Sequence, residues 1–174
     1  MIEKKKFHIN WKRVLLFVLL FSILATFISA FMYYRTIMES KNEGFDEAIE
    51  FVLQHTDMIQ VNDVNYFQEA EGYFILEATD QSENNYFIFL QDTQPFSTNS
   101  LFIVAQSELL SVKTLENEFQ NECRNCELVQ SKPAMIDHIP LWELTYYDES
   151  NRYVIEYKYL KNGQTYEKLR LTTK

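Results

Sequence analysis

The chain has 174 residues, enough for one ordinary domain or two very small ones. Hydrophobic residues make up 47% of it, and 16 Lys and Arg against 25 Asp and Glu give a formal net charge of −9. This acidic balance argues against nucleic acid, anionic lipid headgroups and anionic wall polymers as partners, because all three would be repelled.

A long apolar run near the N-terminus predicts a membrane-spanning helix. Residues 14–34 contain no charge, and at about 1.5 Å rise per residue this helix would be roughly 30 Å long, which matches the bilayer hydrocarbon. Five basic residues precede the run, so the positive-inside rule predicts a cytoplasmic tail at 1–13 and an extracytoplasmic C-terminal part. The expected location is the cell membrane, with a single pass.

A cleaved signal peptide is the alternative interpretation of the apolar run. Signal peptides have apolar regions of about 7–15 residues that end in small residues. The run at 14–34 is longer, and Ile28-Ser29-Ala30 matches a cleavage site poorly because Ile takes the outer position. An uncleaved anchor is therefore favoured, and it leaves 11 basic and 24 acidic residues outside.

The next segment, 35–107, is expected to form a first extracytoplasmic α+β lobe. Apolar residues at helical spacing predict a helix over 45–53. Gly44 is expected to separate this helix from the membrane span, although one continuous helix is possible. Three or four strands follow, with a polar hairpin turn at 80–85. The expected strands are 60–68, 73–79, 86–91 and 101–105.

The same order of elements recurs over 108–174, the expected second lobe. A helix is predicted over 112–122, with Ser111 as its N-cap. Alternation of apolar and polar residues then predicts four strands, and Asn162-Gly163 lies in the last hairpin turn. The expected strands are 127–134, 141–147, 153–160 and 165–171.

Corresponding positions in the two lobes lie 67 or 68 residues apart. Val112 lies 67 residues after Phe45, and Asp148 lies 68 after Asp80. This period predicts two copies of one unit, in which a helix packs on an antiparallel sheet. The expected fold class is α+β, a transmembrane helix followed by two tandem lobes. Each lobe is small, so packing between them is expected to contribute to stability.

One stretch of the second lobe resembles a known family. Residues 141–148 read Leu-Trp-Glu-Leu-Thr-Tyr-Tyr-Asp, and an aromatic strand follows. This pattern is similar to the TseB (YpmB-like) cell-wall elongation regulators of Gram-positive bacteria, and the resemblance covers the whole chain. The family residues, expected to be structural, are Trp142, Glu143, Thr145, Tyr146, Asp148 and Tyr153.

The resemblance carries expectations about fold and function. It implies one membrane anchor and two extracytoplasmic lobes related to cystatin-like and PepSY folds. It also implies regulation of cell-wall elongation through binding of a class B penicillin-binding protein. Asn162-Gly163 departs from the Asp, Thr and Gly common in PepSY-type hairpins, which puts any ligand role of that hairpin in doubt.

Cys123 and Cys126 form the most conspicuous motif. A zinc site normally needs four ligands, and the sequence offers no second pair. Redox CxxC motifs open a helix, where the thiol pKa is depressed, whereas this motif follows the end of a predicted helix. The favoured interpretation is a local disulfide, or two thiols that tighten the exit from the helix, over a redox site.

Aromatic side chains on neighbouring strands allow two interpretations. Trp142 and Tyr146, with Tyr153, Tyr157 and Tyr159, could form an exposed platform that stacks on sugars. Alternatively they lie in the core beneath the covering helix, which is favoured because half of each strand must face that helix.

The sequence contains no motif for nucleophilic catalysis, phosphate binding or an EF-hand. The chain is therefore expected to be a non-enzymatic interaction protein without cofactor, metal or small-molecule substrate. Its expected partners are the bilayer, through 14–34, and a membrane-bound protein such as a penicillin-binding protein. The alternative is a membrane-tethered inhibitor or propeptide-like regulator of an extracytoplasmic protease, and a third hypothesis is an enzyme whose site the sequence hides.

Overall fold

The computed structural model describes residues 11–171, which divide at Gly44 into two compact units. Helix α1 (Trp11–His55) runs through this division, so the expected helix break at Gly44 is wrong. A single glycine inside a helix costs only about 1 kcal/mol relative to alanine, which is too little to end a helix with good helix formers on both sides.

The first unit contains the predicted membrane span. Its stretch Val14–Tyr33 has a mean hydropathy of 2.7, and none of it is buried within the protein. By length and composition this stretch is compatible with a membrane anchor.

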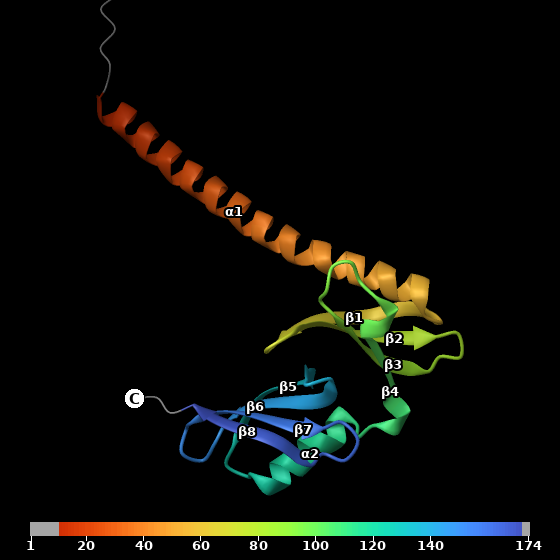
Figure 1. The fold of residues 1–174 in the computed structure, drawn as a ribbon. Helices are drawn as coiled ribbons and strands as arrows, with labels where there is room; N and C mark the ends of the chain where they lie inside the picture. The colour runs from red at the N-terminus through yellow and green to blue at the C-terminus, as the bar shows by residue number, and fades with distance from the viewer. Residues whose placement is uncertain (1–10, 172–174) are drawn as a thin grey trace, which may run out of the picture. The chain divides into compact units, whose positions relative to one another are not determined.

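The second unit begins with the last turns of α1 and a four-stranded sheet, which together are called the first lobe (Figure 1). The sheet is an antiparallel meander in the order β1-β2-β3-β4. Ala48 and Val52 of α1 are fully buried against one face of it. The strands are β1 (Met58–Gln68), β2 (Gly72–Asp80), β3 (Asn85–Gln91) and β4 (Leu101–Ala105), and short helices η1 (Thr98–Ser100) and η2 (Gln106–Glu108) flank β4.

The second lobe repeats this plan with helix α2 (Val112–Glu122) and a second meander in the order β5-β6-β7-β8. The Ser111 side chain accepts a hydrogen bond from the N–H of Thr114, which is the predicted N-cap. Leu115 and Phe119 are the buried residues of α2. The strands are β5 (Glu127–Ile136), β6 (Ile139–Tyr147), β7 (Tyr153–Tyr159) and β8 (Thr165–Leu171), so every predicted strand is present.

The two sheets pack on each other through the faces that their helices leave free. Phe67 of β1 meets Tyr157 of β7 edge to face, with ring centroids 6.4 Å apart. Ile75 and Phe89 from the first lobe share one buried cluster with Leu141 of the second. The unit therefore has four layers, the end of α1, two sheets and α2, and the expected packing between the lobes is present (Figure 1).

The turns show the repeat at the level of single hydrogen bonds. Asp80 Oδ1 accepts the backbone N–H groups two and four residues later, at 2.8 and 2.9 Å. Asp148 Oδ1 makes the same two bonds, at 2.9 and 3.0 Å. Hydrogen bonds led by the Arg152 side chain lower the pKa of Asp148 to about 2, so this turn is held by an ionised carboxylate.

The predicted aromatic stripe divides between two faces of the second sheet. Trp142 pairs with Lys158 and Glu143 with Tyr157, so Trp142 and Tyr157 point to opposite sides. Trp142, Tyr146 and Tyr157 are 4%, 2% and 6% exposed, so these three are core. The first sheet, rather than α2, covers Tyr157, and the single exposed platform is excluded because strand alternation separates its members.

Trp142→Ala is expected to lower the free energy of unfolding by about 3–5 kcal/mol, because it removes a large ring that is only 4% exposed and leaves a cavity. Urea denaturation followed by circular dichroism measures this loss. Val129→Ala is the control, since that side chain is 52% exposed and its loss should cost less than about 1 kcal/mol. Equal stability of both variants would contradict the core assignment of Trp142.

Gly163→Ala is expected to destabilise the second lobe by about 1–2 kcal/mol, because φ is +67° there and alanine is strained in that conformation. An added Cβ would also lie 2.9 Å from Leu110 Cδ2 and 3.3 Å from Glu118 Oε2. Thermal unfolding of the variant tests this, and an unchanged midpoint would show that the turn tolerates a side chain.

Candidate functional site

A cavity of about 450 Å³ lies at the junction of the two lobes. We call it the lobe-junction cavity. Strand β1 forms part of its wall on the first lobe and β5 on the second, and each is the outer strand of its sheet. The chain segment 109–113, which leads from η2 into α2, closes the space between them.

The first lobe gives the cavity two carboxylates that lie directly across from each other. Asp63 of β1 pairs with Glu77 of β2 in the strand register. Burial and the charge of Asp63 raise the pKa of Glu77, and a hydrogen bond with Gln106 partly opposes this. Asp63 also accepts a hydrogen bond from the Asn65 amide at 2.6 Å. Within residues 11–171 neither carboxylate has a salt-bridge partner.

The second lobe contributes a lysine whose charge is already compensated. Lys132 Nζ lies 3.1 Å from Glu143 Oε1, and the Tyr157 hydroxyl donates to Glu143 Oε2 at 3.0 Å. Burial and the charge of Glu143 raise the pKa of Tyr157, so the phenol stays a donor at neutral pH. Glu143, a residue of the family pattern, thus has a structural role beneath the cavity.

Trp142 connects three parts of the chain at the base of this cavity. Its indole N–H donates to the Leu110 carbonyl at 3.3 Å. Its ring meets Phe87 of the first lobe edge to face, with centroids 5.5 Å apart. Among the predicted site residues, Trp142 is the one that lines the lobe-junction cavity.

A polar contact between the lobes is centred on His138, in the turn between β5 and β6. The Tyr73 hydroxyl lies 2.8 Å from Glu71 Oε2 and 2.9 Å from His138 Nδ1. The imidazole also stacks on Phe102 of β4, with ring centres 5.7 Å apart. Nothing in the sequence around His138 signals this contact, because its partners lie at least 36 residues away along the chain.

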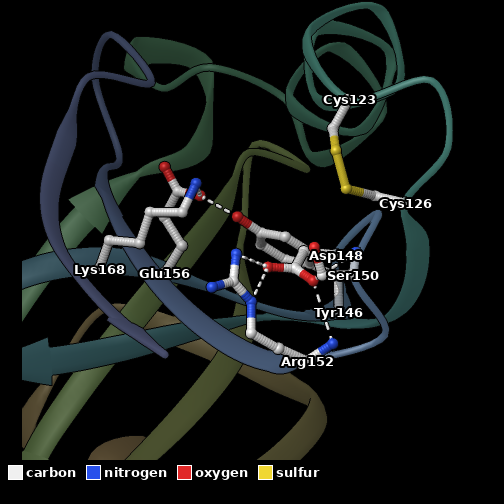
Figure 2. The surroundings of a disulfide bond; sticks show 8 residues. All are labelled: Cys123, Cys126, Tyr146, Asp148, Ser150, Arg152, Glu156 and Lys168. Carbon is white, nitrogen blue, oxygen red and sulfur yellow. Dashed lines mark hydrogen bonds and ion pairs between the residues drawn. A yellow bond between two sulfur atoms is a disulfide. The ribbon is translucent and has the colours of Figure 1, made fainter. Parts of the chain in front are cut away.

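The structure joins Cys123 and Cys126 by a disulfide at the end of α2 (Figure 2). Cys123 is the C-cap of the helix, and its N–H donates to the Phe119 carbonyl at 2.8 Å. The bond therefore lies where a helix ends, rather than at the N-terminus that activates redox thiols. It therefore crosslinks the chain locally, between the end of α2 and the start of β5.

Beside the disulfide, charged groups are paired with one another (Figure 2). The Tyr146 hydroxyl donates to Glu156 at 2.7 Å, and Lys168 Nζ lies 3.0 Å from the same carboxylate. Burial opposes ionisation of Glu156, but these hydrogen bonds outweigh it and lower its pKa. Arg152 pairs with Asp148 at 2.7 Å. This network satisfies its own members and holds β6, β7 and β8 together.

The remaining family-pattern residues lie outside the lobe-junction cavity. Thr145 is buried within the sheet, and Tyr153 packs against Tyr147 with ring centroids 5.4 Å apart. The sequence interpretation missed Asp63 and Glu77, although hairpin pairing of β1 with β2 would have set them opposite each other. Among the described residues there is no group of three His, Cys, Asp or Glu arranged to hold a metal ion.

Comparisons with known proteins give one sequence match and one solved structure, both from Bacillus subtilis. No family model matches the chain. It is 24% identical over 156 residues to the probable cell wall elongation regulator TseB of Bacillus subtilis (strain 168), which covers 88% of this chain and 94% of that protein.

The fold is also found in a solved structure, the YpmB protein from Bacillus subtilis. The TM-score is 0.66 at 19% sequence identity, with 74% of this chain and 98% of that chain covered. At this level of identity the likeness concerns the fold. The chain is thus similar to TseB along most of its sequence and shares its fold with the YpmB protein.

Proposed function

We propose that this chain is a membrane-anchored, non-enzymatic regulator of cell-wall elongation that works by binding a class B penicillin-binding protein. The observation that carries the proposal is the match to TseB, whose name gives it as a probable cell wall elongation regulator, over 88% of this chain. The kind of partner comes from the family resemblance in the sequence of β6 and its following turn.

The exposed apolar helix supports the part of the proposal that concerns anchoring. Val14–Tyr33 has no cover within the protein, as a segment that contacts lipid requires. The basic tail before it supports an orientation with the N-terminus inside. Anchoring raises the effective concentration of the unit from Phe45 onward towards other membrane proteins, so a modest intrinsic affinity is sufficient.

The lobe junction supports binding as the mode of action. The cavity has walls from both lobes, and its charged groups are two carboxylates on one wall and lysines on the other. Such a surface can recognise a protein segment by charge and shape. A partner held there would contact both lobes and the segment between them.

Crosslinking of the intact protein in living cells, followed by identification of the co-purified protein, tests this function. Recovery of a class B penicillin-binding protein supports the proposal. Recovery of an extracytoplasmic peptidase in its place would contradict it and favour an inhibitor or propeptide-like regulator.

The anchor itself gives a separate prediction. A form beginning at Thr36, exported by a cleaved signal peptide, retains the compact unit but loses the membrane tether. It should fail to restore normal growth and cell shape to cells that lack the protein, because the effective concentration at the membrane is lost.

The matched control replaces residues 14–34 with an unrelated single-pass helix of the same orientation. This control should restore growth and shape, since it keeps the tether and changes only the helix sequence. Full restoration by the exported, unanchored form would contradict the role of the anchor.

A further inference from the structure

We infer that the lobe-junction cavity binds a partner segment that places a lysine or arginine side chain between Asp63 and Glu77 and an apolar side chain against the segment 109–112. The inference deepens the proposed function and rests on it for the identity of the partner. It assigns the binding surface and the chemistry that this surface recognises.

The two carboxylates of the first lobe form a site that favours a positive charge. Asp63 and Glu77 are direct cross-strand neighbours, and like charges in that arrangement destabilise a sheet. Both line the cavity, and Glu77 is half-buried there. A cationic side chain between them would remove the repulsion and pair with both, so the site is complementary to a basic group.

The opposite wall does not supply that cation. Lys132 Nζ pairs with Glu143 Oε1 at 3.1 Å, and the Tyr157 hydroxyl donates to the other oxygen of the same carboxylate. Lys113 lies in the first turn of α2 at the cavity rim and is exposed. Across the described residues neither lysine makes a salt bridge with Asp63 or Glu77. Both carboxylates can therefore accept a basic group from another molecule.

The rest of the cavity fits an extended peptide segment. Leu109, Leu110 and Val112 are half-buried and give it an apolar side. Strands β1 and β5 each pair on one side alone, so backbone groups on their outer edges are available to an added strand. Main-chain bonds along either edge, with one basic and one apolar side chain directed inwards, would give both affinity and specificity.

The cost of this arrangement in the free protein distinguishes a binding role from a structural one. Burial and the charge of Asp63 raise the pKa of Glu77, so its ionisation at neutral pH opposes folding. If the two carboxylates stabilised the fold, their removal would lower the stability of the free protein. If they serve binding, their removal should raise that stability and weaken the complex.

The test neutralises the pair without a change of shape, with Asp63→Asn and Glu77→Gln together in the full-length protein. The matched control, Asp46→Asn with Glu50→Gln, removes two exposed carboxylates from the end of α1. The probe is the extracytoplasmic part of the class B penicillin-binding protein. The cavity variant should bind it at least about tenfold more weakly, because the partner's basic side chain loses its two carboxylate partners. The control should bind as the native protein does.

Thermal unfolding of the same proteins supplies the second measurement. The cavity variant should unfold at a higher temperature than the native protein, because the repulsion is gone. Unchanged affinity would overturn the inference. Weaker binding together with a lower unfolding temperature would also overturn it, since the carboxylates would then be structural.

Photocrosslinking in cells separates this inference from the proposed function. A photoreactive residue replaces Lys113 at the cavity rim or, as control, Glu149 in the turn between β6 and β7. A crosslink from position 113 to a basic segment of the penicillin-binding protein supports both claims. A crosslink to that protein from position 149 alone would contradict the lobe-junction cavity as the binding surface but would still support the proposed function.

Two other outcomes have equally definite meanings. A crosslink from position 113 to a basic segment of a different, identified membrane protein supports the cavity and overturns the penicillin-binding protein as partner. The absence of a crosslink from either position to any membrane protein overturns the cavity assignment.

Discussion

The apolar packing between the two sheets is the interaction on which the rest of the structure depends. Each sheet has one face covered by its own helix, and a lobe alone would leave its other face in water. Phe67 and Phe89 of the first lobe bury this face against Leu141 and Tyr157 of the second. The same contact brings the outer strands β1 and β5 to one cavity, so the binding surface is a consequence of lobe packing.

The two lobes share a plan but differ in what their helices cover. Ile88 and Leu90 of β3 face α1 within an apolar cluster. The positions 68 residues later are Glu156 and Lys158, which lie 3.7 Å apart, and Lys158 also reaches Glu122 of α2 at 3.3 Å. Buried charges require partners, so the Lys158–Glu122 ion pair positions α2 in addition to apolar contact. No buried side-chain polar atom among the described residues lacks a hydrogen bond.

Local patterns predicted most of the elements, because strand alternation and the Ser111 cap act over short stretches of chain, and the 67-residue period then related the two lobes. The helix break expected at Gly44 is absent, because the helix-forming residues on both sides outweigh the low helix propensity of glycine. The site was harder to predict. Asp63 looks like one more surface acid until strand register sets it opposite Glu77. The placement of Tyr157 against the first sheet depends on how two sheets meet, which sequence periodicity does not contain.

The central claim is that the lobe-junction cavity is the binding surface. Hydrogen exchange of backbone amides tests this most directly. The full-length protein is compared with and without the extracytoplasmic part of the penicillin-binding protein. We expect new protection in the outer strands β1 and β5 where they line the cavity, and in the segment 109–113. Protection confined to β8 or to the end of α2, with the cavity unchanged, would contradict the claim.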